Sequence, residues 1–92
     1  MSVTNLPVGG YKQISATGNV SALPANLIGI FVSAATATPT ITVYDDAATG
    51  TSTKIVDTFT PTAATWYPLP FSASKGLYVV LGGTVSATVA FA

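Results

Sequence analysis

The sequence contains neither cysteine nor histidine. Without cysteine, the chain has no disulfide bond and no thiolate to act as a nucleophile or metal ligand. Without histidine, it lacks the most common general base and the most common metal ligand in proteins. These two absences remove most routes to catalysis and to metal binding, so we expect no catalytic residue, no cofactor and no metal site.

Charged residues are also scarce, at 7% of the 92 residues, against roughly 25% in ordinary soluble domains. Three lysines balance three aspartates, and arginine and glutamate are absent. Nucleic-acid binding needs clustered cations that displace the counterions of phosphates, so we expect no nucleic-acid partner. A surface with so little charge also lacks the repulsion that keeps small proteins apart, which favours packing against copies of itself or other subunits of an assembly.

The few remaining candidates for chemistry are better interpreted as turns. Asp45 and Asp46 are neighbours at the end of an expected strand, so their side chains point apart and cap a turn, unlike a glycosidase pair or a calcium loop. Ser74 and Lys75 could form a serine–lysine pair, but Gly76 follows directly and indicates an exposed turn. We therefore predict that the protein is not an enzyme.

Long hydrophobic runs are missing as well. The longest apolar stretch, LIGIFV, is far shorter than the roughly 18 residues of a membrane-spanning helix. The N-terminal residues MSVTNLPVGGY do not have the basic region and apolar block of a secretory signal. We expect no membrane association, and synthesis in a cytoplasm.

The residues that are present predict an all-β protein. Hydrophobic residues make up 49% of the chain, threonine and valine are spread throughout, and proline or glycine interrupts every window of several helical turns. We expect one small antiparallel β-sandwich of seven to eight strands over residues 11–92, with either a jelly-roll or an immunoglobulin-like topology. Residues 1–10 are expected to form an extended arm, because Pro7 and the pair Gly9-Gly10 interrupt them.

Individual strands can be placed from the pattern. Residues 11–16 and 66–71 are expected at sheet edges, the latter because Pro68 and Pro70 cannot donate to a central ladder. Residues 26–34 are apolar on both faces and are expected in the centre of a sheet or at a subunit contact, with a bulge at Gly29. Residues 38–46 and 54–60 are expected to form a hairpin.

The end of the chain is predicted to be core. Residues 77–81 and 84–91 alternate strictly and are expected to form a tight hairpin around Gly82-Gly83. Burial of its apolar face is worth on the order of 10 kcal/mol as an upper figure, at about 1.5–3 kcal/mol for each large side chain. This face is expected to contain Leu77, Val79, Leu81, Val85, Ala87, Val89 and Phe91.

Candidate interface residues come from the aromatic side chains and the arm. Trp66 and Tyr67 are of the types most often found as interface anchors; the alternative is that Trp66 is a core residue of a small sandwich. In the arm, an extended segment around Pro7 can dock onto a neighbouring sheet. The full set of expected protein-interface residues is Leu6, Val8, Tyr11, Phe31, Trp66 and Tyr67.

The order GIFVSAATATPTITVYDDAATGTSTKIVDTFTPTAATWYPLPF, followed by GLYVVLGGTVSATVAF, resembles small accessory proteins encoded in the structural gene clusters of tailed bacteriophages. The resemblance covers most of the chain from Tyr11 to Ala92. It implies a virion component, foremost a capsid decoration (cement) protein on the capsid surface, which binds at junctions of the major capsid protein. It further implies a small β-sandwich or jelly roll that forms a homotrimer.

Two other functions remain open from the sequence. A tail, neck or fibre component would contact the host or the portal, and a carbohydrate-binding module would present tryptophan and tyrosine platforms to a glycan. Because no side chain titrates between pH 5 and 8 at its usual pKa, we expect attachment to a capsid shell to change little across that range.

Overall fold

The structure is a computed structural model that describes residues 10–92, and these residues form six antiparallel strands in one open sheet with no helix. The all-β prediction is confirmed. In chain order, the strands are β1 (Gly10–Ile14), β2 (Gly18–Ser21), β3 (Ala25–Asp45), β4 (Lys54–Phe59), β5 (Thr65–Ala73) and β6 (Leu77–Phe91). β1 therefore includes Gly10, which the sequence analysis placed in the arm.

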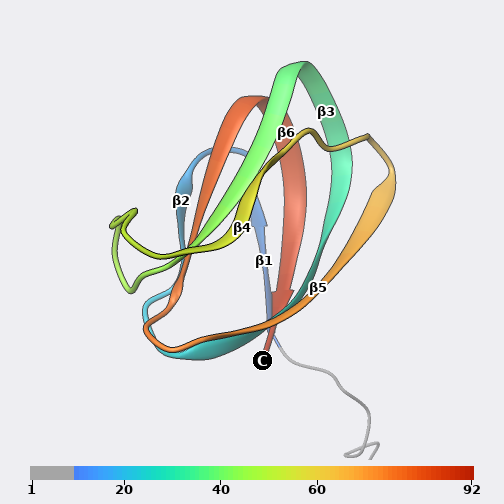
Figure 1. Cartoon of the computed structure of the whole chain (residues 1–92). Coiled ribbons are helices and arrows are strands. Elements are labelled where there is room, and N and C mark those ends of the chain that lie inside the picture. Colours follow the sequence, from blue (N-terminus) through green and yellow to red (C-terminus); the bar gives the residue numbers. More distant parts are fainter. Residues whose placement is uncertain (1–9) are drawn as a thin grey trace, which may run out of the picture.

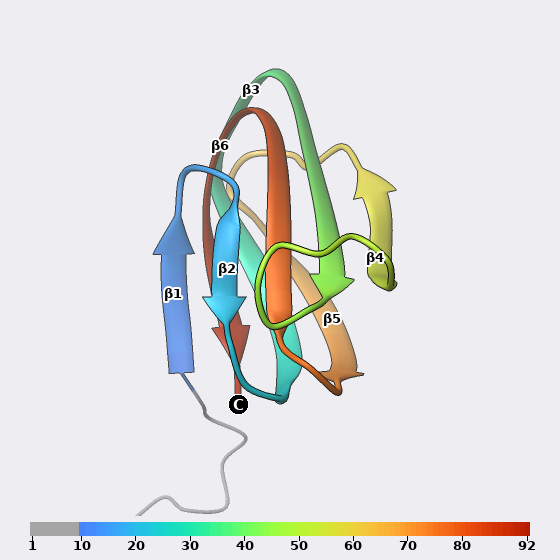
Figure 2. The same cartoon turned by 90° about the vertical axis from the view of Figure 1, so that its left-hand side faces the viewer.

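The two longest strands, β3 and β6, hold the sheet together. Both rise to a bend at the top of the view and run down again, and they lie side by side along their length (Figures 1 and 2). Residues 25–36 of β3 pair with β5 and with the last part of β6, whereas residues 40–45 pair with β4 and with the first part of β6. The last part of β6 also pairs with β1, and its first part pairs with β2. Each long strand therefore belongs to both halves of the sheet.

The prediction of a hairpin at the end of the chain is wrong. Residues 77–81 and 84–91 form one continuous strand, and both segments pair with β3 rather than with each other. Gly83 has a φ of 66°, and a Cβ atom there would collide with the carbonyl oxygen of Ala37. The two glycines thus allow β6 to bend closely over β3, a role that local sequence cannot distinguish from a two-residue turn.

The bend of β3 also joins two expected strands into one. The expected strands at residues 26–34 and 38–46 are parts of one strand, whose register shifts between Thr36 and Thr40. Ala37 and Thr38 have φ values of 58° and 55°, in the left-handed region that costs a non-glycine residue about 1–2 kcal/mol. Two expected pairs of strands are therefore continuous, which gives six strands rather than seven or eight.

The other strand placements agree with the structure. β5 pairs only with β3 and β1 only with β6, so both lie at edges, whereas β3 is central. β3 and β4 form the expected antiparallel pair, and the register of β3 is irregular between Leu27 and Gly29, where a bulge was predicted.

The core lies on the inner sides of β3 and β6 and forms one cluster. The prediction that the end of the chain is core is confirmed, although Leu81 and Phe91 are only half-buried. Thr42 is also buried, at 4% exposed, and its hydroxyl lies 2.6 Å from that of Thr58. The largest fully buried side chains are Leu27, Ile30, Val32, Ile41, Val43, Leu77, Val79, Val85 and Val89.

Candidate functional site

An uncharged surface with exposed aromatic side chains covers one side of β1, β6, β3 and β5. Tyr11 is 75% exposed, Phe31 41% and Trp66 45%. They lie on one side of the sheet, because Trp66 pairs with Phe31, Phe31 pairs with Thr88, and Tyr11 pairs with Ala90, two residues further along β6. We call the surface around Tyr11, Phe31 and Trp66 the aromatic face.

The sheet register arranges this face in two cross-strand rows. Each row takes one residue from each of β1, β6, β3 and β5, in that spatial order. Since no bulge interrupts the β1–β6 ladder, the rows run without a step from β1 to β6. The first row is Gln13, Thr88, Phe31 and Trp66, and the second is Tyr11, Ala90, Gly29 and Pro68.

Trp66 is held in place by a close approach to β3. Two carbon atoms of its indole ring lie 2.5 Å from the position that a Cβ atom on Gly29 would occupy, so only glycine leaves room for the ring there. The indole therefore covers Gly29, which is buried, while nearly half of the Trp66 side chain stays accessible. An exposed tryptophan that is already fixed loses little conformational entropy when a partner covers it.

No charged side chain lies on the aromatic face. Lys12 stands between Tyr11 and Gln13 on β1 but pairs with the buried Val89, and its Nζ donates a hydrogen bond to the carbonyl oxygen of Asn19 at 3.0 Å. It therefore belongs to the other side of the strand.

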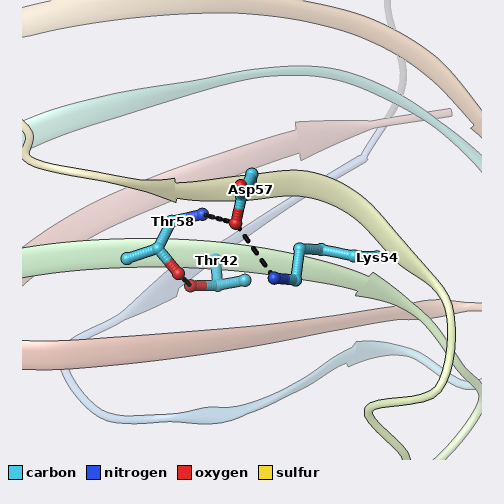
Figure 3. Close-up of polar contacts among 4 residues, drawn as sticks. All are labelled: Thr42, Lys54, Asp57 and Thr58. Atoms are coloured by element: carbon cyan, nitrogen blue, oxygen red, sulfur yellow. Dashed lines mark hydrogen bonds and ion pairs between the residues drawn. The ribbon is translucent and has the colours of Figure 1, made fainter.

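A pair of opposite charges lies on β4. The Nζ of Lys54 is 2.9 Å from a carboxylate oxygen of Asp57, and Figure 3 shows this pair beside the contact between the hydroxyls of Thr42 and Thr58. The hydrogen bond from Lys54 holds the pKa of Asp57 below its usual value. Both side chains are exposed, so this pair contributes little to stability.

The remaining carboxylates bind the backbone of turns: Asp46 caps its own turn, as predicted, whereas Asp45 binds the turn between β5 and β6, which is distant in the sequence. The Asp45 carboxylate accepts hydrogen bonds from the backbone N–H groups of Ser74, Lys75 and Gly76 and from the Ser74 hydroxyl. Burial alone would raise the pKa of Asp45, but these hydrogen bonds outweigh it and leave the pKa lowered. Asp46 accepts from the backbone N–H of Ala48 at 2.7 Å, and hydrogen bonds of this kind lower its pKa too.

The SASKG stretch forms a turn that is held by the Asp45 carboxylate. The Ser74 hydroxyl donates to a carboxylate of Asp45 at 2.9 Å, and Lys75 is exposed in the turn between β5 and β6. Gly76 lies so close to the carbonyl oxygen of Ser21 that a Cβ atom would collide with it. The expected turn is therefore present, and it packs against β2.

The structure brings together three of the six expected interface residues: Tyr11, Phe31 and Trp66. Tyr67 lies on the opposite side of β5, where its ring packs 5.1 Å from that of Phe59 and its hydroxyl accepts a hydrogen bond from the backbone N–H of Thr62. Leu6 and Val8 lie outside the described residues.

Sequence reasoning missed the residues between the aromatic side chains. Gln13, Thr88, Ala90 and Pro68 join the face only because β6 lies between β1 and β3. The alternation of Thr84, Ser86 and Thr88 places them on one side of a strand, but it does not identify the neighbouring strands.

Other kinds of site have no counterpart in the part of the chain that the structure describes. Residues 10–92 contain no group of three or more acidic, cysteine or histidine residues that could hold a metal ion, and they enclose no pocket. None of them belongs to a helix that could cross a membrane. No protein-family model, no curated protein and no solved structure matches the chain.

Proposed function

We propose that this chain is a non-enzymatic structural protein of a tailed-phage virion, which decorates the capsid and binds at junctions of the major capsid protein. The observation that carries the proposal is the aromatic face, on which three large aromatic side chains are exposed without any charge among them. Interface centres are rich in tyrosine, tryptophan and phenylalanine and poor in charged residues, so the composition of this face is typical of a protein–protein contact.

The strand pairing supports a finer fold assignment, a small jelly roll. One four-stranded layer would consist of β1, the last part of β6, the first part of β3, and β5. The second would consist of β2, the first part of β6, the last part of β3, and β4. The pairing of each edge strand with only one part of a long strand supports this division, as do the bends at residues 36–40 and 82–83.

Decoration of a shell suits such a domain physically. A cementing protein acts through surface contacts with several subunits, and modest contacts made at the same time multiply through their effective concentration. In this chain the carboxylates bind backbone N–H groups or Lys54, so these carboxylates serve the fold. The broad uncharged surface is the feature left for a partner.

The copy number of the chain in purified virions tests the proposal. Quantitative mass spectrometry of particles whose genome encodes the chain should find it in a fixed stoichiometric ratio to the major capsid protein. A few copies per particle would instead identify a tail, neck or fibre component, and absence from the particle would overturn the virion assignment. A titration of the isolated chain with glycans, followed by Trp66 fluorescence, tests the alternative of a carbohydrate-binding module. Only such a module would give a fluorescence change that saturates with glycan concentration.

A further inference from the structure

We propose that the outer edge of β1 binds an extended segment of another polypeptide as an additional strand, with an acidic residue of that segment opposite Lys12. The contact is made by the backbone of β1, whereas the capsid contact proposed above is made by the side chains of the aromatic face. The inference goes beyond the virion function and does not depend on it.

β1 is an edge strand with a free side. It lies at the margin of the sheet (Figure 2), and β6 is its only partner strand among residues 10–92. The ladder between the two strands runs from Gly10 with Phe91 to Ile14 with Ala87 without a register shift. An edge strand presents backbone N–H and C=O groups that another strand can bind. β1 therefore offers a regular template for one more strand.

The hydrogen bonds at the end of the chain show which way the backbone groups of β6 point. The N–H of Asn26 donates to the C=O of Ala92 at 2.9 Å, and the N–H of Ala92 donates to the C=O of Asn26 at 2.8 Å. The groups of Ala92 therefore face the start of β3. Because this direction alternates along an antiparallel strand, the groups of Phe91, Val89 and Ala87 face β1.

The same alternation identifies the free groups of β1. The partners of those three residues are Gly10, Lys12 and Ile14, which use their backbone groups in the ladder with β6. Tyr11 and Gln13 lie between these partners, so their N–H and C=O groups point away from the sheet. Two donors and two acceptors are thus free, at the spacing of one strand that pairs with another. An extended backbone is the ligand that satisfies all of them at once.

The other edge strands are protected against such pairing. β5 contains Pro68 and Pro70, which lack an N–H group, and its register with β3 is irregular. The ladder of β4 with β3 has two register shifts, and that of β2 with β6 has one. Proline and bulges are among the devices that protect an edge. Of the edge strands that the structure describes, β1 alone has neither, so it is the one suited to accept a partner.

Lys12 makes β1 a poor partner for its own copy. In an antiparallel pair of two β1 strands, all the free groups of both are bonded only if Tyr11 of each strand lies opposite Gln13 of the other. That register sets Lys12 directly opposite Lys12 of the second copy. Like charges at directly opposite positions destabilise a strand pair. A different polypeptide is therefore the better occupant.

The same side chain selects an acidic residue in the partner. The Nζ of Lys12 donates a hydrogen bond to the C=O of Asn19 at 3.0 Å, and the only ion pair among residues 10–92 joins Lys54 to Asp57. The charge of Lys12 is thus not matched by a carboxylate in this part of the chain. Because opposite charges directly across two strands attract each other, a carboxylate opposite Lys12 stabilises the added strand.

The residues on either side of the acidic one meet a different environment. Successive side chains of a strand point to opposite sides, so these neighbours lie beside Tyr11 and Gln13 at the end of the aromatic face. Tyr11 is 75% exposed there, and an apolar side chain covers part of its ring. The segment that fits best is therefore extended and carries an acidic residue between two apolar ones.

A titration of the isotopically labelled full chain with synthetic peptides, followed by NMR, tests the proposal. The probe is Thr-Thr-Val-Glu-Val-Thr-Thr with blocked ends, and the matched peptide has lysine in place of glutamate. The glutamate peptide should bind with a dissociation constant of about 1 mM or tighter, and it should protect the N–H groups of Tyr11 and Gln13 from exchange with solvent. The lysine peptide should bind at least about threefold more weakly. In Lys12→Glu the preference between the two peptides should reverse.

Proline substitutions test which N–H groups are free. Gln13→Pro removes a free N–H without breaking the β1–β6 ladder, so it should keep the fold and weaken binding of the glutamate peptide about tenfold. Lys12→Pro is the matched control, because it removes an N–H that bonds to β6 and should lower the urea midpoint clearly more than Gln13→Pro does. Far-UV circular dichroism verifies folding. Tyr11→Pro, which removes the other free N–H, replaces Gln13→Pro if the latter does not fold.

Several results would overturn the proposal: a dissociation constant of the glutamate peptide weaker than about 1 mM, equal affinity for the two peptides, or binding that Gln13→Pro leaves unchanged. Protection of the N–H groups of Tyr11 and Gln13 in the chain without peptide would also overturn it, because residues 1–9 or a second copy would then already cover the edge.

The outcome is independent of the virion test. Peptide binding by a chain that is absent from virions refutes the virion function alone. A chain that is present in virions in a fixed ratio to the major capsid protein but binds neither peptide refutes the strand site alone.

Discussion

Asp45 is the last residue of β3, and its carboxylate accepts hydrogen bonds from three successive backbone N–H groups, those of Ser74, Lys75 and Gly76. It is 9% exposed, and it joins the end of the central strand to the turn between β5 and β6. A buried donor that loses its acceptor costs about 1–3 kcal/mol. At the scale of single residues, this carboxylate therefore contributes to the stability of the fold.

Replacement of Asp45 by asparagine should lower the free energy of unfolding by about 1–3 kcal/mol at pH 7, because the amide group presents a donor to N–H groups that need acceptors. The folded-state pKa of Asp45 lies below its unfolded value, so its contribution is fully present above the unfolded pKa and is lost as the pH falls through the folded pKa. The wild type should therefore lose stability below about pH 5, and Asp45→Asn should lose less over the same interval. Urea unfolding at pH 7 and pH 3, followed by Trp66 fluorescence, measures both effects.

Asp57→Asn is the control for this prediction. Its carboxylate is exposed and pairs only with Lys54 and the neighbouring backbone, so the substitution should leave the unfolding curve at pH 7 almost unchanged. Equal stability of Asp45→Asn and wild type at pH 7 would contradict the role assigned to the carboxylate.

At the scale of elements, the bends of β3 and β6 decide the shape of the sheet. Gly83 adopts its φ of 66° without steric cost, whereas Ala37 and Thr38 adopt left-handed φ values that their Cβ atoms oppose. The pairs formed on either side of the bend, such as Ala35 with Val85 and Ile41 with Leu81, keep these residues in place. The strain in β3 is thus balanced by long-range pairing.

Ala37→Gly should increase the free energy of unfolding by about 0.5–1 kcal/mol. Removal of the Cβ atom relieves about 1–2 kcal/mol of left-handed strain, and the extra freedom of glycine in the unfolded chain offsets about 0.5–1 kcal/mol of that gain. The shift of the urea midpoint measures the difference.

Ala34→Gly provides the comparison, since Ala34 is also an exposed alanine of β3 that pairs with β6, but its φ is not positive. This change should destabilise the protein by about 0.5–1 kcal/mol. If both substitutions lower the midpoint equally, the bend stores no strain at Ala37.

At the scale of the whole molecule, the two halves of the sheet cannot separate without breaking the same two strands. Val79 lies in the part of β6 that pairs with β2, and Val89 lies in the part that pairs with β1; both are fully buried. Because β3 and β6 continue through both halves, the core is one cluster. The chain should therefore unfold as a single cooperative unit, as small single domains usually do.

Val79→Ala tests this cooperativity, because Trp66 reports from the other half of the sheet. The substitution should lower the free energy of unfolding by about 1.5–3 kcal/mol. It should also shift the unfolding midpoint by the same amount in Trp66 fluorescence and in far-UV circular dichroism. Val89→Ala, on the same half as Trp66, should behave identically. A fluorescence midpoint that Val79→Ala leaves in place would mean that the halves unfold separately.

The aromatic residues of the candidate site could be predicted from the sequence, but the residues that lie between them could not. Trp66 and Phe31 are recognisable from residue type and from the apolar pattern of their strands, and Pro68 with Pro70 identifies β5 as an edge strand. Tyr67 was predicted as an interface residue together with Trp66, but it lies on the opposite side of β5. The reason is that neighbouring residues of a strand point to opposite faces of the sheet. The rows across β6 could not be predicted, since they depend on which strands pair.

The sequence by itself determined the all-β class, the buried side of the strand at residues 77–91, the edge positions of β1 and β5, and the turn-capping of Asp46. Each of these follows from local alternation, from the missing N–H of proline, or from the reach of a short side chain. Only the tertiary structure decided that Gly82-Gly83 and residues 37–39 are bends within continuous strands. The backbone angles that glycine allows fit a hairpin and a bend equally well, and the pairing of β3 with β6 along both their parts selects the bend.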